Sequence, residues 1–286
     1  MSAITITTRP DGVAVLTFDQ PGSKANVLTR ELWTEFGEAL TGLASRTDLK
    51  GLVLASAKPG IFIAGADLKL LANAPGPNDP DVRAFIEQGL RVLERLEALP
   101  FPTCAAIDGA ALGGGLEVAL ACDYRVCGTN PKVQLGLPEV TLGLIPGWGG
   151  TQRLPRVIDV NCMHAACNLV TTAKVLNAQE AVAREVADVV IESPALAEQA
   201  VYRALRVEWK HRREQKRLPV PKGYWDQFTP LREVTGAAAE AVRVMIEGAA
   251  LPLYDAIRLE TEAFMRLAGS DESKRLIAEF FASRKK

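Results

Sequence analysis

The sequence predicts an α/β fold, and three observations support this prediction. Short apolar runs, such as Gly51–Ala55 and Pro102–Asp108, are typical of strands that are covered on both faces. They alternate with segments whose apolar residues recur at helical spacing, as from about Val82 to Leu99. At Ala64–Asp67 and again at Gly109–Gly115, a strand pattern ends in small residues that lead into a helical pattern. If the strands are parallel neighbours, these two stretches of small residues lie close together.

The N-terminal part predicts a hairpin followed by a helix. Ile4–Thr8 and Val13–Asp19 have strand patterns and flank a Pro-Asp-Gly turn. Thr29 is placed to cap a helix whose apolar face carries Leu32, Phe36, Leu40 and Leu43.

The second half of the chain predicts mainly helices. Helical patterns dominate from Thr151 to about Ala187, and Leu218–Thr235 contains three prolines and predicts a connecting loop. From Ala237 onward an alanine-rich pattern predicts two or three helices. The sequence shows no internal repeat.

Composition limits the classes of function. The 286 residues carry a net charge of −1, which gives no electrostatic case for nucleic acid as the main partner. No apolar run approaches the ~20 residues that span a bilayer, and the N-terminus has a strand pattern rather than that of a secretory signal. Five cysteines in mostly apolar surroundings indicate reduced, buried thiols and a cytoplasmic location.

Several common kinds of active site are missing from the sequence. The two histidines, His164 and His211, stand near no nucleophile motif, and no Cys/His spacing is typical of a zinc site. Phosphate-loop and dinucleotide-binding fingerprints are also missing. Any chemistry must therefore come from carboxylates and main-chain donors, with no metal.

The clearest candidate for such chemistry is the run Gly113-Gly114-Gly115-Leu116-Glu117. Glycines directly before a helix expose N–H groups with the positive end of the helix dipole behind them, which suits an oxygen that becomes negative during a reaction. Glu117 lies on the first turn of this helix. The alternative is a glycine-rich bend at which a buried helix packs tightly.

Two further features each allow two interpretations. Glu139 follows a proline within an apolar segment, where desolvation raises the pKa of a carboxyl group; the alternative is a solvated loop glutamate. Trp209–Arg217 is the strongest basic cluster, and it predicts a solvated helix face or linker, or alternatively a phosphate-binding site.

Three motifs together resemble the crotonase, or enoyl-CoA hydratase/isomerase, superfamily. They are IFIAGADLK (61–69), GAALGGGLEVALACDYRV (109–126) and LGLPEVTLGLIPGWGGTQRLPR (135–156). The resemblance is strong from about Ile4 to Arg156. The last part, notably ETEAFMRLAGSDESKRLIAEFF (260–281), is most similar to the hydratase part of multifunctional fatty-acid oxidation α-subunits.

The resemblance implies a crotonase-like spiral of ββα units over residues 1–190 with the acyl-CoA site, and a C-terminal helical region over 191–286 that serves as lid, oligomerisation or linker helices. It implies that the amides of Ala66 and Gly114 bind the thioester carbonyl. Glu117 would orient and activate the water that adds to C3, and Glu139 would deliver the proton to C2. Both glutamates are present, which favours hydration of 2-trans-enoyl-CoA in fatty-acid β-oxidation.

The resemblance also implies a substrate site. Lys24 lies where relatives contact the CoA phosphates or adenosine, although a solvated loop lysine is the alternative, and Ala64 would contact adenine through its main chain. Gly65, Asp67, Leu68 and Gly113 complete the predicted substrate-binding set. CoA is part of the substrate, so no separate cofactor is expected.

Other functions and assemblies remain open at this stage. The alternatives to a hydratase are a 3,2-enoyl-CoA isomerase or another crotonase reaction, and a non-catalytic CoA- or RNA-binding relative. Family members form trimers or paired trimers (hexamers), whereas the multifunctional relatives do not, so we expect a homo-oligomer or a part of a β-oxidation assembly.

The chain departs from the family pattern in two turns. Relatives carry a glycine after the helix that follows the third motif and another before the next strand. The corresponding segments here, Leu169–Ala173 and Arg184–Asp188, contain no glycine, which leaves the backbone of both turns to be tested.

Overall fold

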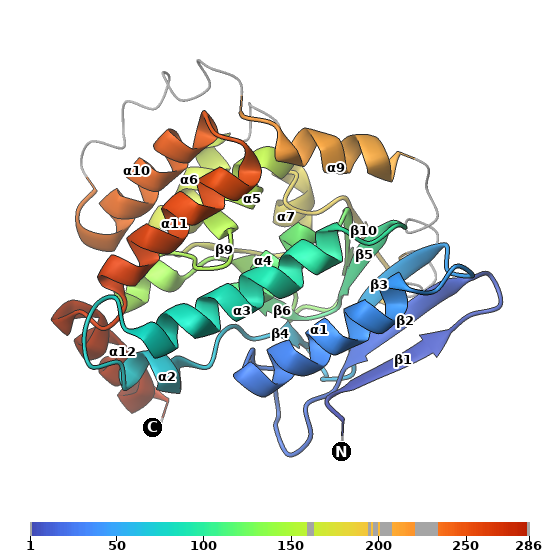
Figure 1. Cartoon of the computed structure of the whole chain (residues 1–286), viewed down its shortest axis with the longest axis horizontal. Helices are drawn as coiled ribbons and strands as arrows, with labels where there is room; N and C mark the ends of the chain where they lie inside the picture. The colour runs from blue at the N-terminus through green and yellow to red at the C-terminus, as the bar shows by residue number, and fades with distance from the viewer. Residues whose placement is uncertain are drawn as a thin grey trace.

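We describe the protein from a computed structural model, which covers residues 2–158, 163–193, 196, 200, 208–220 and 234–284 (Figure 1). The predicted α/β fold is confirmed. Helices and two sheets share a continuous apolar core that extends from the N-terminal hairpin to the last helix.

The larger sheet has six described strands in the order β1-β2-β3-β5-β7-β10. β1 and β2 form the expected antiparallel hairpin, and the other neighbouring strands are parallel. The residues of β5 are all buried and those of β3 nearly so, which explains their continuous apolar sequences. The strands are β1 (Ile4–Thr8), β2 (Val13–Phe18), β3 (Gly51–Ser56), β5 (Thr103–Ile107), β7 (Tyr124–Gly128) and β10 (Val189–Ile191).

The smaller sheet has the order β4-β6-β8-β9. Its first three strands are parallel, and β9 runs antiparallel to β8. The strands are β4 (Ile61–Ile63), β6 (Ala110–Leu112), β8 (Gln134–Gly136) and β9 (Val175–Leu176).

Consecutive strands enter the two sheets alternately. β3 is followed by β4, β5 by β6 and β7 by β8, and each pair leads into a helical element. These elements are α2 (Leu68–Ala72), α4 (Gly114–Ala121) and the 3-10 helix η1 (Glu139–Leu142). The chain therefore winds as a spiral of ββα units, and pairing of β4, β6 and β8 brings the ends of these strands together.

The remaining helices cover this spiral. In Figure 1, α1 and α3 lie side by side in front of the sheets, and α10 and α11 form an antiparallel pair beside them. α12 contacts η1 and α2 of its own chain, so the C-terminus folds back onto the smaller sheet's helical elements. The ranges are α1 (Arg30–Ala44), α3 (Pro80–Glu97), α5 (Gly150–Val157), α6 (Met163–Thr171), α7 (Ala178–Ala183), α9 (Trp209–Arg217), α10 (Gly236–Ala249), α11 (Leu253–Leu267) and α12 (Asp271–Ser283).

Two predictions about single elements are confirmed. Every residue of α4 is buried, as its apolar sequence on all sides indicates. The C-terminal part forms three helices, α10 to α12, of which the first begins at Gly236, one residue before the predicted start.

Most of the predicted loop Leu218–Thr235 lies outside the described residues. None of the helices in the described part of the chain is both long and apolar enough to cross a membrane.

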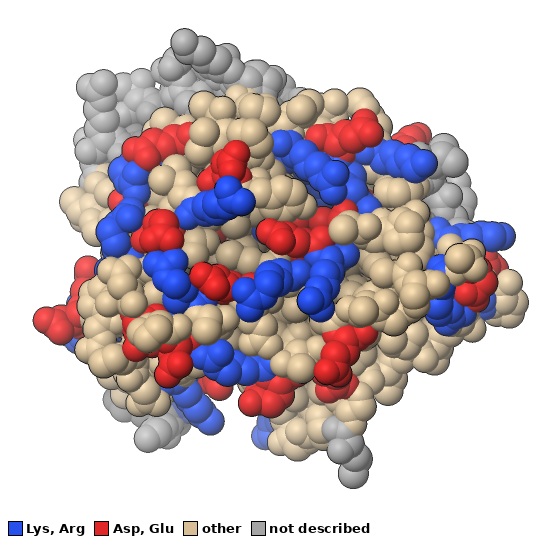
Figure 2. Space-filling view, in the orientation of Figure 1, with Lys and Arg blue, Asp and Glu red and all other residues tan. Residues whose placement is uncertain are grey.

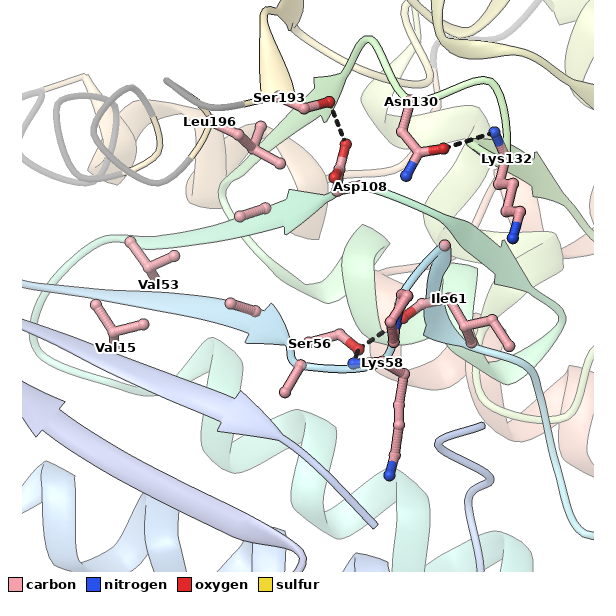
Figure 3. A pocket seen from close by; sticks show the side chains of 15 residues that line it. Val15, Val53, Ser56, Lys58, Ile61, Asp108, Asn130, Lys132, Ser193 and Leu196 are labelled. Atoms are coloured by element: carbon pink, nitrogen blue, oxygen red, sulfur yellow. Dashed lines mark hydrogen bonds between the residues drawn. The ribbon is translucent and has the colours of Figure 1, made fainter. Parts of the chain in front are cut away.

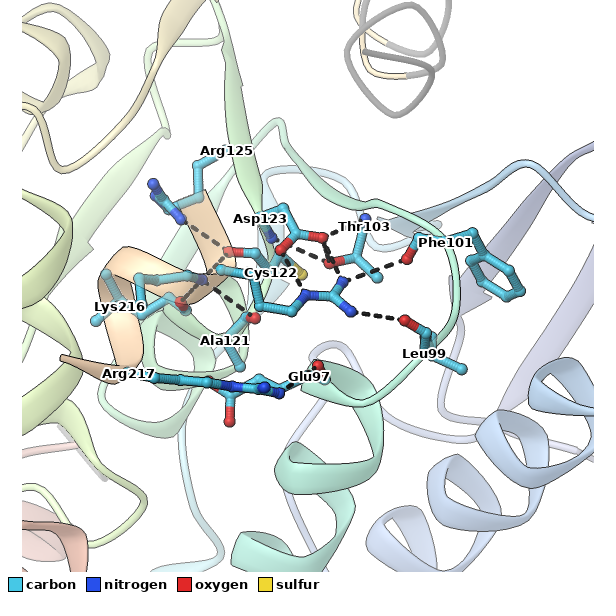
Figure 4. A network of polar contacts seen from close by, with 12 residues as sticks. Glu97, Leu99, Phe101, Thr103, Ala121, Cys122, Asp123, Arg125, Lys216 and Arg217 are labelled. Atoms are coloured by element: carbon cyan, nitrogen blue, oxygen red, sulfur yellow. Dashed lines mark hydrogen bonds and ion pairs between the residues drawn. The ribbon is translucent and has the colours of Figure 1, made fainter. Parts of the chain in front are cut away.

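The interpretation of Trp209–Arg217 as a solvated face is wrong for two of its cations. Arg213 is buried and pairs with Asp123 at 2.6 Å, and it also donates to the Leu99 carbonyl at 2.6 Å. Lys216 is buried and donates to three carbonyls at the C-terminal end of α4, with 2.7 Å to Cys122 O (Figure 4). Cations stabilise helix C-termini, so Lys216 of α9 stabilises the C-terminal end of α4, the helix that carries Glu117.

The two turns without glycine still adopt the backbone that glycine favours. Ala173 has φ +54° and Glu185 has φ +58°, both in the left-handed region. An L-residue in this region costs roughly 1–2 kcal/mol. Both turns are therefore left-handed at these positions although neither residue is glycine.

The described cysteines are buried free thiols, as expected. They are Cys104, Cys122, Cys127 and Cys167, and burial raises the pKa of the last three to about 12. Cys162 lies outside the described residues.

Candidate active site

An apolar cavity of about 270 Å³ lies where β4 and β6 end and where α4 and η1 begin. Its walls include eight of the ten residues predicted for the site, among them both glutamates. The predicted residues that line it are Ala64, Gly65, Ala66, Leu68, Gly113, Gly114, Glu117 and Glu139.

A second, more polar cavity of about 510 Å³ lies elsewhere, at the ends of β2, β3 and β5 (Figure 3). Its carboxylate, Asp108, accepts a hydrogen bond of 2.6 Å from Ser193 Oγ, and Lys58 and Lys132 stand at its wall. None of the residues predicted for the site lines this cavity. We therefore assign the candidate active site to the smaller cavity, which combines main-chain donors with two acids.

Two residues that line the smaller cavity have unused amides. The neighbours of Ala66 and Gly114 are engaged: Asp67 N donates to Leu28 O at 3.1 Å and Gly113 N donates to Gly136 O at 2.9 Å. The amides of Ala66 and Gly114 themselves donate to no acceptor among the described residues. Gly114 is the first residue of α4, so its N–H lies at the positive end of the helix dipole. These two groups are suited to bind an anionic oxygen.

Glu117 is held in a fixed orientation inside the core. Its side chain is buried, and Oε1 accepts hydrogen bonds from Trp148 N and Gly150 N, both at 2.7 Å. Burial and the neighbouring charges of Glu260 and Glu139 raise the pKa of Glu117 well above its usual range, and the two amide bonds oppose this shift. Both hydrogen bonds end on Oε1, and Oε2 accepts no hydrogen bond from the described residues.

Glu139 faces the start of α4. Glu139 is the first residue of η1. Gly113 has φ +53°, and a Cβ atom added to it would lie only 2.8 Å from Glu139 Oε1. Glycine at 113 therefore permits both the backbone turn and the close approach of the carboxyl group. Oε2 is buried without a hydrogen-bond partner among the described residues, and burial raises the pKa of Glu139 to about 8. This carboxyl group favours its protonated form at neutral pH.

A third glutamate joins this cluster, and sequence reasoning missed it. Glu260 of α11 is fully buried and accepts hydrogen bonds from Gly149 N at 2.5 Å and Thr151 N at 2.8 Å. The available signal was its position within the apolar stripe of α11, between Ile257 and Phe264. A buried carboxylate at such a position needs donors, and α5 supplies them.

The remaining walls of the cavity are mostly apolar, with Thr141 and Arg284 as the exceptions. Trp148 forms part of the wall, and its indole N–H donates to Ile86 O at 3.0 Å. The C-terminal helices also contribute residues to the cavity wall, and the sequence did not indicate which residues these would be. The other wall residues are Leu71, Leu112, Pro138, Thr141, Leu142, Leu144, Gly147, Phe264, Phe280 and Arg284.

Two predicted substrate contacts lie outside the walls of this cavity. Lys24 is exposed in the loop before α1. Asp67 caps α2, because its carboxylate accepts a hydrogen bond from Lys69 N at 3.0 Å. A role of Lys24 in CoA binding stays a prediction, and the side chain of Asp67 has a structural function in the helix cap.

Comparison with known proteins gives consistent results. A sequence model of the enoyl-CoA hydratase/isomerase family matches residues 8–219. An enoyl-CoA hydratase from Bacillus anthracis is 29% identical, with a TM-score of 0.63 over 100% of this chain and 97% of its own. A Geobacillus kaustophilus structure described with the same activity is 27% identical, with a TM-score of 0.64 over 99% and 95%. One from Mycobacterium avium subsp. paratuberculosis shares the fold at 19% identity, with a TM-score of 0.69 over 99% and 96%.

Proposed function

Because the chain belongs to the enoyl-CoA hydratase/isomerase family, we propose that it is a hydratase that adds water to 2-trans-enoyl-CoA to give 3-hydroxyacyl-CoA. One observation carries this proposal. Two residues with unused amides, the buried Glu117 and the half-buried Glu139 line the same cavity. Family membership supports action on a CoA thioester, and the two acids support hydration in particular.

In the proposed mechanism the thioester oxygen binds the amides of Ala66 and Gly114. Addition at C3 moves negative charge onto this oxygen, and the donors stabilise it as it forms. Loss of one such donor typically costs about 3–4 kcal/mol of transition-state stabilisation. The dipole of α4 acts in the same direction at Gly114.

The two glutamates handle the protons of the reaction. The water oxygen bonds to C3 while one water proton passes to Oε2 of Glu117, whose Oε1 is occupied by two amides. Glu139 gives its proton to C2, consistent with its pKa of about 8. Transfer of a proton from Glu117 to Glu139 then restores the starting state, so one water molecule supplies all the added atoms.

The experiment that tests this proposal is loss of the absorbance of the conjugated thioester. Crotonyl-, decenoyl- and hexadecenoyl-CoA together report both activity and the preferred acyl length. Absence of hydration with all three substrates would contradict the proposal.

Separate Glu117→Gln and Glu139→Gln variants distinguish hydration from isomerisation. The two-carboxylate mechanism predicts that either change lowers hydration by roughly 10²–10⁴-fold. Isomerisation needs a single acid–base group, so an enzyme that tolerates Glu117→Gln and shifts the double bond of 3-enoyl-CoA is an isomerase instead.

The structure weakens the alternative of an RNA-binding relative. Two cations of the basic cluster that supported it, Arg213 and Lys216, are buried. On the face shown in Figure 2, the described basic side chains are interspersed with acidic ones. Arg83 pairs with Glu262 and Arg243 pairs with Glu240.

We further propose fatty-acid β-oxidation in the cytoplasm as the setting of this reaction. The ligand is an acyl-CoA, no separate cofactor is required, and the chain acts as a trimer, a hexamer or a part of a larger β-oxidation assembly.

A further inference from the structure

Glu260 connects the C-terminal helical region to the start of α5. Its Oε1 accepts from Gly149 N at 2.5 Å, and its Oε2 accepts from Thr151 N at 2.8 Å and from Thr151 Oγ1 at 2.5 Å. The side chain is fully buried, so these donors replace water as its hydrogen-bond partners.

The same segment holds Glu117. The N–H groups of this segment alternate between two acceptors. Those of Trp148 and Gly150 donate to Glu117. Those of Gly149 and Thr151 donate to Glu260. Two carboxylates therefore share four consecutive N–H groups at the start of α5. Because these amides belong to consecutive peptide units, a shift of the pair bound by Glu260 also moves the pair bound by Glu117.

Charged groups surround Glu260 on several helices. Arg153 of α5 faces it, and the Arg153 guanidinium forms two hydrogen bonds of 2.8 Å to Glu97 of α3. On α11 itself, Tyr254 donates to Glu97 at 3.4 Å. Burial raises the pKa of Glu260 to about 7, while Thr151, Gly149 and Arg153 oppose this shift.

The acids of the candidate site also face Glu260. Its negative charge raises the pKa of Glu117 and that of Glu139, in both cases after the larger effect of burial. A third charge close to the site therefore favours retention of a proton by its neighbours.

We propose that Glu260 is a positioning residue for the reaction, which fixes the carboxylate of Glu117 by holding the Trp148–Thr151 segment in place. This inference rests on the proposed hydratase activity. Glu260 does not line the cavity, so it acts through the amides that it shares with Glu117 rather than by contact with substrate.

The direct test is Glu260→Gln, with Glu262→Gln as the matched control. The partners of Glu260 are mainly donors, so an amide at this position places its own NH₂ group against an N–H and leaves one backbone donor without an acceptor. Glu262 lies on the same helix but pairs with Arg83 at the surface. We expect Glu260→Gln to lower kcat for crotonyl-CoA by roughly 10²-fold with KM nearly unchanged, and Glu262→Gln to retain the wild-type kcat.

Two further readouts separate positioning from a purely structural role. Loss of the Glu260 charge lowers the pKa of Glu139, so the alkaline limb of the kcat profile should move to lower pH. Binding of butanoyl-CoA, a saturated analogue, should remain close to that of wild type. Loss of kcat and of butanoyl-CoA binding together, with an unmoved alkaline limb, would overturn the inference.

A milder variant guards against failure of Glu260→Gln to fold. Thr151→Val removes the hydroxyl bond to Glu260 and retains the amide bonds, and it should lower kcat by a smaller factor without raising KM. Wild-type kcat in both variants, with active wild-type enzyme, would overturn the positioning role. Inactive wild-type enzyme would instead overturn the proposed function.

Discussion

Gly113→Ala tests the contact between the start of α4 and Glu139. Gly113 has φ +53°, and the new Cβ would lie 2.8 Å from Glu139 Oε1, a separation at which one group must move. The left-handed backbone costs alanine roughly 1–2 kcal/mol, which should appear as lower free energy of unfolding in denaturant. Displacement of the proposed proton donor by a few tenths of an ångström should lower kcat by roughly 10- to 100-fold.

The matched control is Gly236→Ala. Gly236 begins α10 with φ +58°, but among the described residues a Cβ there would meet only Glu272 at 3.8 Å, an ordinary contact. Both variants should therefore lose similar stability, and only Gly113→Ala should lose kcat in the crotonyl-CoA absorbance assay. A Gly113→Ala enzyme with kcat within twofold of the control would refute the assigned placement or role of the Glu139 carboxyl group.

Three further predictions follow from the same geometry. The pKa of Glu139 is raised to about 8, so kcat for hydration should fall as pH rises through this value; a flat profile to pH 9 would contradict its role as proton donor. Lys216→Met should lower the free energy of unfolding by roughly 1–3 kcal/mol because carbonyls at the end of α4 lose their donor, whereas Lys210→Met at the exposed start of α9 should not. Burial lowers the pKa of Lys216 in the folded state to about 8, so between pH 8 and the ordinary lysine pKa of 10.5 the unfolded state binds more protons than the folded state. The free energy of unfolding of wild type should therefore rise relative to that of Lys216→Met over this pH range. Ala173→Gly and Glu185→Gly should each raise the free energy of unfolding by roughly 0.5–1 kcal/mol by relieving positive φ, and a loss of stability in both would contradict the left-handed assignment.

Local patterns were sufficient to predict the α/β class and two stretches of small residues that lead into helices, whereas the spiral was predicted from the resemblance of three motifs to the crotonase superfamily. Small residues at the ends of β4 and β6 leave main-chain groups accessible, and glycines before a buried helix indicate an unoccupied N-terminus. The carboxyl groups of Glu117 and Glu139 could therefore be named from short stretches, whereas the amides of Ala66 and Gly114 were assigned from the resemblance. The structure brings the four residues to one cavity, while their chemical roles remain proposals.

Contacts between distant segments could not be predicted in the same way. Glu260 meets Thr151 across 109 residues, and its amphipathic helix carries no local sign of which donors it will find. Arg213 lies within a run of charges, a pattern that usually indicates solvent, and only the docking of α9 shows that it pairs with Asp123. Burial of charge depends on tertiary partners, so composition alone gave the wrong surroundings for Arg213 and Lys216.

The central claim is that the amides of Ala66 and Gly114 hold a thioester oxygen while Glu117 and Glu139 face the reacting carbons. A crystal structure of the protein with butanoyl-CoA tests it most directly. We predict the thioester oxygen at about 3 Å from both amide nitrogens, with C2 and C3 between the two carboxyl groups. A thioester bound away from these amides, for example in the cavity lined by Lys58 and Lys132, would contradict the account.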